Sequence, residues 1–470
     1  MPRNPRAFMV IVAASAVACS SADSVPVTNQ YTVSSANAWA GSTVTVVSAG
    51  LRAHTDTGSI FLGTYVLPVH RENDSTASVT LPDTISGSFA PILRLGAWTQ
   101  PLDSITVYGY ADVATYPFAS DWDTYASPRS AAHAMIMTSG DDDTLRFVDL
   151  DTHQFTSLGG ELLHGGSGVG LWGPGPSYDG SFYLEQGQAA AIVAPWQLAP
   201  VPAQIPAGLA RLAPLTEAQN VMRLGASTWF ASQKTGAWIV SLADTAATTF
   251  AGASFAPVSG VGGPMNGLVI SPRGDRAAIL PVSAPGGVPV LTMPEGNVAF
   301  RISNLQTNAT DADFSADGSL LAMAGDAGDL HRVIVVNATT GATVHDTTIA
   351  YPVESVRFSP DKARLYVESP VADSSSSPVA WYPRVLVLNA ATFGVLGQLT
   401  APHSSSATLC HAGGCFVRIA LNTTGSLYFF DGTVLTNQAT SHAWRFTVAP
   451  QSADAQAVVR PRSGAIAGSQ

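Results

Sequence analysis

Apolar and polar residues alternate in short runs along much of the chain, and turns rich in Gly, Pro, Asp and Asn separate these runs. In residues 42–47, 76–82 and 104–110, every second side chain is apolar. Because successive side chains of a strand point to opposite faces of its sheet, this pattern predicts half-buried β-strands. Charged residues make up only 12% of the chain, fewer than the exposed faces of many surface helices need. The sequence therefore predicts an all-β protein.

A four-residue turn of the form Ser-Pro-Asp-Gly, followed by a short apolar strand, recurs through most of the chain. The clearest copies are SADG at residues 315–318 and SPDK at residues 359–362. All copies, including the weaker ones, begin at residues 127, 177, 222, 271, 315, 359 and 422. A period in the forties with strands on both sides is typical of β-propeller blades. The copies predict seven blades over residues 116–450, and the degenerate copies at residues 127 and 222 leave six or eight blades as alternatives.

The best-preserved repeat predicts four strands, near residues 310–314, 320–324, 332–337 and 344–349. A second turn follows its third strand, as NATTG at residues 337–341, and the next repeat has NAATFG at residues 389–394. This combination of turns resembles the YVTN-type and WD-repeat-like propellers of bacterial surface proteins. The resemblance implies a scaffold that serves binding and, less often, catalysis.

Residues 31–112 precede the repeats and contain short alternating strands, which predict a small Ig-like β-sandwich. The order of GSTVTV at residues 41–46, a strand ending at Leu81-Pro82, and GSF at residues 87–89 resembles an IPT/TIG immunoglobulin-like domain. The Cys…Trp…Cys spacing of antibody domains is absent from this sequence. After the repeats, residues 451–470 are predicted to form a last strand or a disordered tail.

The first residues have the pattern of an export signal, with Arg3 and Arg6 before a short apolar run. The tetrapeptide AVAC at residues 16–19 resembles the lipobox of bacterial lipoproteins, with Ala where that family prefers Leu. The resemblance implies that residues 1–18 are a signal peptide and that Cys19 carries the lipid. Residues 19–30 then read as a tether, and an ordinary secretory signal is the alternative.

An exported protein can keep a disulfide between its other two cysteines, Cys410 and Cys415, because disulfides persist in oxidising compartments. Only four residues separate them, and two of these are glycines that let the chain fold back. We predict a disulfide between them. The alternative is a metal site that includes His411, but two thiols and one imidazole leave a tetrahedral site one ligand short.

The net charge of −11 argues against binding to nucleic acid, which needs a basic face. Contact with the membrane is expected only through the N-terminal lipid, and a monomer is expected. The sequence has no His-Glu-x-x-His, no Gly-x-Ser-x-Gly and no Gly-x-x-x-x-Gly-Lys motif, so it offers no catalytic residue.

Three features of the predicted loops are candidates for binding. Asp141, Asp142 and Asp143 form a cluster that could supply oxygen ligands to calcium, although a solvated turn explains it more simply. His331 lies near two acids on the equivalent loop of a later blade. An insertion at residues 373–383 carries Trp381 and Tyr382, which either bind a ligand at the rim or fold back onto the neighbouring blade.

These observations predict an exported, lipid-anchored protein of the bacterial cell envelope, at the outer membrane and facing the periplasm or the surface. Its propeller would bind an envelope protein or glycan, without a required cofactor. The alternative is a propeller hydrolase or lyase, similar to a lactonase, with His, Glu or Arg side chains or a metal at the central channel. A third interpretation is a structural spacer.

Overall fold

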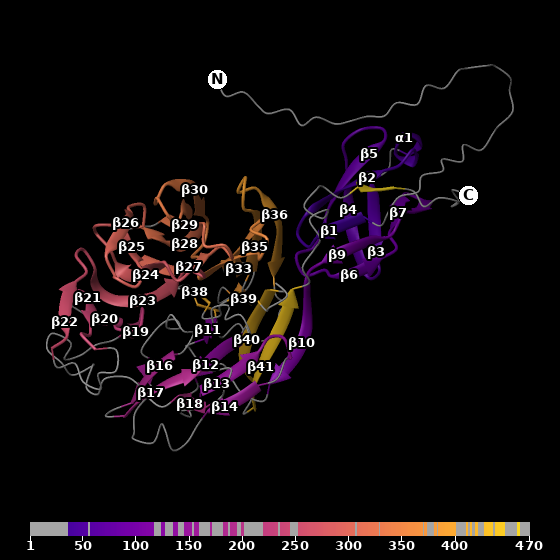
Figure 1. Ribbon diagram of the computed structural model, residues 1–470. Helices are drawn as coiled ribbons and strands as arrows, with labels where there is room; N and C mark the ends of the chain where they lie inside the picture. The colour runs from indigo at the N-terminus through magenta and orange to yellow at the C-terminus, as the bar shows by residue number, and fades with distance from the viewer. Residues whose placement is uncertain are drawn as a thin grey trace, which may run out of the picture.

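The computed structural model (Figure 1) describes residues 36–54, 57–116, 220–233, 236–244, 252–305, 308–328, 330–369 and 384–400, together with short segments, mostly strands, up to residue 460. The described chain is nearly all β, which confirms the predicted class. The short helix α1 (Gly50–Ala53) is the helix among these residues, and no described helix has the length and apolar character of a membrane span.

The N-terminal domain contains a seven-stranded sheet, in the order β42-β2-β5-β4-β3-β7-β8, and a three-stranded sheet, in the order β1-β9-β6. The strands are β1 (Ala36–Trp39), β2 (Thr43–Val47), β3 (Gly58–Leu62), β4 (Tyr65–Arg71), β5 (Thr76–Thr80), β6 (Gly87–Phe89), β7 (Ile92–Leu95), β8 (Trp98–Pro101), β9 (Ile105–Tyr108) and β42 (Val458–Val459). The alternate apolar residues of the predicted strands form its core: Val44, Val46, Ala77, Val79, Ile105 and Val107 are buried.

The strand pairing adds two features to the strands predicted for this domain. Residues 87–95 form β6 and β7, which belong to different sheets. Pro91 lies between them and has no N–H to donate to a ladder, so the strand ends there. In addition, β42 comes from the far end of the chain and pairs in parallel with β2, so the domain includes residues beyond the predicted 31–112.

From Tyr110 to Phe446, the described strands form successive four-stranded antiparallel sheets arranged around a ring, the architecture of a β-propeller (Figure 1). The strands of these sheets, in chain order, are β11 (Thr124–Ala126), β12 (Met135–Ser139), β13 (Leu145–Asp149) and β14 (Phe155–Leu158); β15 (Gly170–Leu171), β16 (Phe182–Gln186), β17 (Ala189–Ala194) and β18 (Ala199–Val201); β19 (Asn220–Arg223), β20 (Thr228–Gln233), β21 (Gly236–Ser241) and β22 (Ser254–Pro257); β23 (Gly262–Ile270), β24 (Arg276–Ser283), β25 (Val288–Thr292) and β26 (Val298–Ile302); β27 (Asn308–Phe314), β28 (Leu320–Ala327), β29 (Leu330–Asn337) and β30 (Thr343–Ile349); β31 (Ser355–Phe358), β32 (Arg364–Glu368), β35 (Arg384–Asn389) and β36 (Val395–Thr400); and β39 (Ala420–Leu421), β40 (Leu427–Leu435) and β41 (Gln438–Phe446) with β10 (Tyr110–Tyr116). We name each sheet by its first strand, for example the β27 sheet.

The sheets pack face to face, as the alternation of apolar residues along their strands requires. In β28, Leu321 and Met323 belong to a cluster shared with the β23 sheet. The intervening Ala322 and Ala324 belong to a cluster shared with the β31 sheet. Because both faces of a strand are buried in this way, its sequence is almost continuously apolar.

The recurring turn joins the first strand of a sheet to the second. In the β27 sheet, the Ser315 hydroxyl donates to Asp317 Oδ1 at 2.8 Å, and Gly318 has a φ of 65° that favours glycine. The copies at residues 271 and 359 lie at equivalent positions in the β23 and β31 sheets. The second copy has Lys362 in place of the glycine, at a φ of 61°. The copy predicted at residue 222 begins two residues too early. The N–H of Leu224 donates to the Thr228 carbonyl, the bond that the Ser315 N–H makes to the Leu320 carbonyl in the β27 sheet. The copies at residues 127, 177 and 422 lie outside the described residues.

Candidate binding site

The two ends of the propeller carry different turns. The recurring turn lies beside the turn after the third strand, since the Ala338 N–H donates to the Ser319 carbonyl at 2.9 Å and Ala390 makes the same bond to Ala363. The turns between second and third strands, and the connections between sheets, therefore lie at the opposite end. We call that opposite end the hairpin face.

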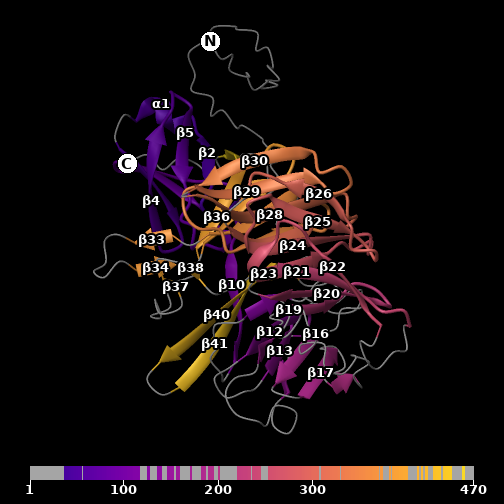
Figure 2. The same ribbon diagram turned by 90° about the vertical axis from the view of Figure 1, so that its left-hand side faces the viewer.

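Two extra hairpins lie on the hairpin face of the β31 sheet (Figure 2). One hairpin, β33 (Val371–Asp373) and β34 (Ala380–Tyr382), is inserted between β32 and β35. The other, β37 (Cys410–His411) and β38 (Gly414–Cys415), lies in the connection after β36, and β34 is in contact with β37. The insertion predicted to carry two aromatic residues at the rim is thus a hairpin with a second hairpin beside it.

The strand pairing in the two hairpins shows where the predicted aromatic residues and cysteines lie. Trp381 is paired with Ala372 and Tyr382 with Val371, so the two aromatic residues occupy the second strand of the insertion. Cys410 is paired directly with Cys415. Directly paired residues of antiparallel strands have Cα atoms about 4.5–5.5 Å apart, which falls within the range that a disulfide spans. The register therefore suits the predicted disulfide, which remains a prediction.

The two ends of the inserted hairpin are held together at Ser369 and Arg384. The Ser369 N–H donates to the Arg384 carbonyl at 2.8 Å, and Arg384 Nε donates to the Ser369 carbonyl at 3.3 Å. The Arg384 guanidinium also lies 5.6 Å from the centre of the Tyr351 ring. Burial lowers the pKa of Arg384, and the neighbouring Tyr351, Asp83 and Glu368 oppose this change.

Strand β32, which leads into the hairpin, is buried along its whole length although it contains three polar side chains. Arg364, Tyr366 and Glu368 alternate with Leu365 and Val367, and all five are buried. The guanidinium of Arg364 lies 4.8 Å from the centre of the Trp39 ring of the N-terminal domain. Sequence reasoning missed Arg364, Glu368 and Arg384 as functional candidates. The available signal was the presence of charged residues in apolar strands of a chain that has few charges.

The acids on the inner strand β27 connect neighbouring sheets. Asp311 is buried and accepts hydrogen bonds from the Ser355 hydroxyl at 2.7 Å, the Val356 N–H at 3.0 Å and Arg357 Nη1 at 2.6 Å. Asp313 accepts a bond from the Phe358 N–H at 2.7 Å. These bonds join β27 to β31, so the two carboxylates act as ties between the innermost strands rather than as free groups at the channel.

His331 is the second residue of β29 and is paired with Asp326 of β28, so it lies in a strand and not in a loop. Its Nδ1 is 2.7 Å from Asp326 Oδ1. Asn308 Nδ2 donates to the other oxygen of Asp326 at 3.2 Å. The structure thus brings His331 together with one of the acids near it in the sequence. Within the described part of the chain, no group of three or more His, Cys, Asp or Glu side chains could hold a metal ion. The calcium candidates Asp141, Asp142 and Asp143, and the lipidation candidate Cys19, lie outside the described residues.

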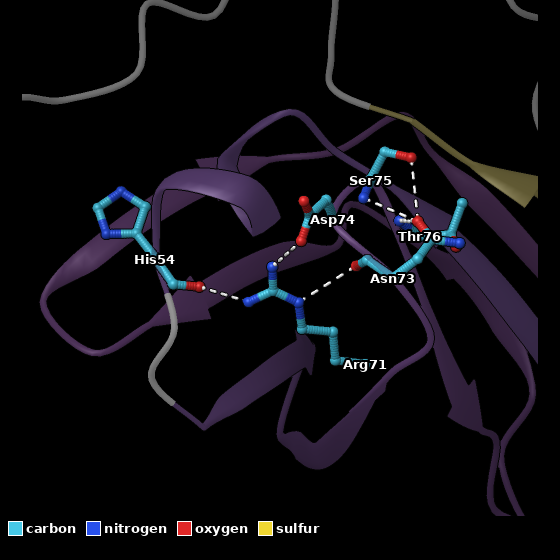
Figure 3. Close-up of polar contacts among 6 residues, drawn as sticks. All are labelled: His54, Arg71, Asn73, Asp74, Ser75 and Thr76. Carbon is cyan, nitrogen blue, oxygen red and sulfur yellow. Dashed lines mark hydrogen bonds and ion pairs between the residues drawn. The ribbon is translucent and has the colours of Figure 1, made fainter.

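A polar cluster in the N-terminal domain has a structural explanation (Figure 3). Arg71 donates to the carbonyls of His54 and Asn73, both at 3.2 Å, and pairs with Asp74 at 2.9 Å. The side-chain oxygen of Asn73 accepts bonds from the N–H groups of Ser75 and Thr76. These contacts close the turn between β4 and β5 and attach the end of α1 to it.

No family model and no curated protein matches this sequence. Among solved structures, the chain is similar to the β-propeller domain of Cps50 (Swd1) from Myceliophteria thermophila, with a TM-score of 0.46 and 10% identity over 72% of this chain and 100% of that one. It is also similar to a chain of a mitotic checkpoint complex, with a TM-score of 0.47 and 14% identity over 72% of this chain and 92% of that one.

Proposed function

We propose that this protein is an exported, lipid-anchored envelope protein whose propeller binds another envelope protein through its hairpin face. The observation that carries this proposal is the contact between β34, which contains Trp381 and Tyr382, and β37, which contains Cys410. Trp and Tyr bury a large area for little loss of conformational entropy, so they are enriched at the energetic centres of protein interfaces. A second hairpin beside them, fastened by a disulfide, would stiffen this surface before binding.

We further propose that the propeller has seven blades and that the N-terminal domain is an Ig-like sandwich of the IPT/TIG type. The order of the four-stranded sheets supports seven blades, with β10 completing the sheet of β39, β40 and β41. Such closure joins the first and last strands of the ring and leaves no open edge between blades. The N-terminal domain would then raise the ring from the lipid on Cys19 at the outer membrane.

Site-specific photo-cross-linking in cells tests the binding surface. A benzophenone amino acid replaces Tyr382 on the hairpin face, and a matched variant carries it at Val395, which is 64% exposed at the opposite end of the β31 sheet. We expect light-dependent products from position 382 and none from position 395. Products whose mass a muramidase leaves unchanged support a protein partner, whereas products that a muramidase converts to about the mass of the uncross-linked protein indicate a glycan instead. Equal products from both positions, or none from either, contradict the proposal.

Metabolic labelling with an alkyne fatty acid tests the anchor. We expect the wild-type protein and a Cys410→Ser variant to take up the label and to sediment with membranes. The Cys19→Ala variant should lose the label. Label retained in that variant contradicts the assignment of Cys19.

A further inference from the structure

Four apolar side chains form a row on the outer face of the N-terminal domain. Phe61 of β3 is paired with Val66 of β4 on one side and with Ile92 of β7 on the other. Ile92 is in turn paired with Pro101 of β8. Directly paired residues point to the same face of a sheet. A neighbour of each along the chain is buried in the core, so these four side chains point away from it. We call them the apolar row.

The apolar row is exposed and narrow. Val66 is 56% exposed and Ile92 is 42% exposed. Two residues along the same strands, the next row contains Ser59, Arg94 and Thr99 and is mostly polar. A single exposed apolar residue is common, but a contiguous apolar strip on the surface marks a contact site. A strip one residue wide fits a single extended segment of chain better than a broad partner surface.

The described chain ends beside one end of the apolar row. The Asp103 N–H donates to the Arg460 carbonyl at 2.7 Å, and Asp103 lies two residues after Pro101. The strand β42, directly before Arg460, is only two residues long, yet Val459 is 1% exposed. Pro461 has no N–H with which to continue the ladder, so β42 ends before it. The segment that follows therefore starts next to the apolar row.

This segment begins with a donor for an unpaired acceptor. Asp103 Oδ2 is buried and has no hydrogen-bond partner within the part of the chain that the structure describes. Buried carboxylate oxygens normally accept hydrogen bonds, and a guanidinium is the donor that matches a carboxylate best. Arg462 is two residues beyond Arg460, whose carbonyl already accepts from Asp103. Arg462 is thus within reach of the Asp103 carboxylate.

Residues 461–470 also have the composition and the reach that the apolar row requires. They contain the apolar run AIA at residues 465–467. Neighbouring strands are about 4.8 Å apart, so the apolar row is about 14 Å long from β8 to β4. The chain from Arg462 to Ile466 spans about 13 Å when extended. With Arg462 at Asp103, Ile466 therefore reaches the middle of the apolar row.

We propose that residues 461–470 dock on the apolar row. Arg462 pairs with Asp103, and Ile466 covers Ile92 in the middle of the row. The contact removes both apolar side chains from water, which favours docking. The docked segment extends the attachment of the chain beyond β42, which is only two residues long, across β8 and β7. This contact is independent of the proposed binding at the hairpin face.

Photo-cross-linking within the full-length protein identifies what covers the apolar row. A benzophenone amino acid replaces Ile92 and keeps that position apolar. The matched variant carries it at Thr80, which is exposed at the end of β5 and belongs to the same tryptic peptide, residues 72–94. After irradiation in cells, we expect position 92 to give a product that migrates as one chain. Its digest should contain residues 72–94 linked to residues 463–470, and position 80 should give no such link.

Two substitutions in the segment test the apolar contact. Ile466→Asp places a charge against the apolar row, and we expect the yield of the link from position 92 to fall roughly tenfold. Ser469→Asp adds the same charge outside the apolar run and should leave the yield unchanged. Equal yields in the two variants overturn the proposal. It is also overturned by equal links from positions 80 and 92, by no link from position 92, or by products there that contain a second copy, another protein or a lipid instead.

Discussion

At the scale of single residues, a left-handed backbone conformation occurs at the same place in three turns between third and fourth strands. Gly296, Gly341 and Phe393 have φ values of 75°, 75° and 58°. Each of these residues also lies against the preceding sheet: Gly296 contacts Ile239, Gly341 contacts Phe300, and the ring of Phe393 stacks on His345 at 4.4 Å. One position therefore sets both the turn and the packing between neighbouring sheets.

This double role predicts that Gly341→Ala destabilises the protein by more than strain alone. A Cβ at Gly341 would lie 2.5 Å from a carbon of the Phe300 ring, whereas a Cβ at Gly274, with a φ of 67°, would meet nothing within 4 Å. A left-handed alanine costs about 1 kcal/mol, and forcing a methyl group into a packed contact adds about 1–3 kcal/mol. We expect Gly274→Ala to lose only the first amount in urea unfolding. Equal losses of unfolding free energy in the two variants would show that the Phe300 ring moves aside without destabilising the protein.

The turn at Asp317 predicts a specific pH dependence. The ammonium of Lys362 at 2.5 Å, and the Ser319 hydroxyl, hold the pKa of Asp317 well below its ordinary value of 3.8. A lowered folded-state pKa contributes stability above the unfolded pKa and loses it as the pH falls through the folded value. Because both side chains are well exposed, the pair contributes at most about 1 kcal/mol at pH 7.

The Lys362→Met variant isolates this contribution, because Met retains the left-handed strain at position 362. We expect it to be slightly less stable than the wild type at pH 7 in low salt. The difference in free energy of unfolding should shrink as the pH falls below about 4, because Asp317 then becomes protonated. It should also shrink in 0.5 M salt, which reduces the screening length to about 4 Å and weakens exposed ion pairs. A difference that is independent of pH and salt would assign the effect to packing of the Lys362 stem.

At the scale of elements, the sequence predicted strands best where the repeat is regular. Residues 310–314, 320–324, 332–337 and 344–349 were expected as strands, and the structure has β27, β28, β29 and β30 at these places. Two features define the ends of the strands there. One is the apolar periodicity, and the other is a turn whose Ser and Asp form a hydrogen bond and whose Gly adopts a positive φ. The strand β1 was missed because its sequence, ANAW, lacks alternation. Its position is set by the packing of Trp39 against the β31 sheet of the other domain, and a local sequence pattern contains no information about such a contact.

The candidate site was predicted less completely than the strands. The insertion and its aromatic residues stand out in the sequence because they interrupt a regular interval. Arg384 does not stand out, since its contacts with Ser369 across the hairpin and with Tyr351 before β31 join residues that are far apart in the sequence. A periodic pattern carries no information about contacts of that kind.

The ties between innermost strands predict that Asp311 is essential for stability. Asp311→Ala removes the acceptor of three hydrogen bonds and leaves Arg357 without its carboxylate, in a position where Asp311 is buried. Breaking a buried charged pair in this way costs about 3–5 kcal/mol. Asp346→Ala is the comparison, because Asp346, on the outer strand β30, pairs with Arg332 of β29 and is more exposed than Asp311. We expect a loss of about 1 kcal/mol or less there, and a similar loss at Asp311 would rule out a major tie.

At the scale of the whole molecule, the chain passes between the two domains at both of its ends. Strand β10 leaves the N-terminal domain and pairs with β41 in the ring, and β42 returns from the ring to pair with β2. The Asp103 N–H donates to the Arg460 carbonyl at 2.7 Å, directly after this returning strand. Unfolding of the N-terminal domain would release β42, and opening of the ring would release β10, so the stabilities of the two domains should be coupled.

Trp39 is where this coupling is tested most directly. Its side chain is 1% exposed, lies in the cluster that joins the two domains, and carries Arg364 over its ring. Trp39→Ala removes that contact and leaves a cavity, which costs about 3–5 kcal/mol for a buried Trp. Because the lost energy belongs to the interface, we expect the wild type to unfold in one calorimetric transition and the variant to unfold in two, with the N-terminal domain first. Trp98→Ala is the control, since Trp98 stacks on His54 within the N-terminal domain. A single transition in Trp39→Ala, merely shifted to lower temperature, would show that β10 and β42 couple the domains without the Trp39 contact.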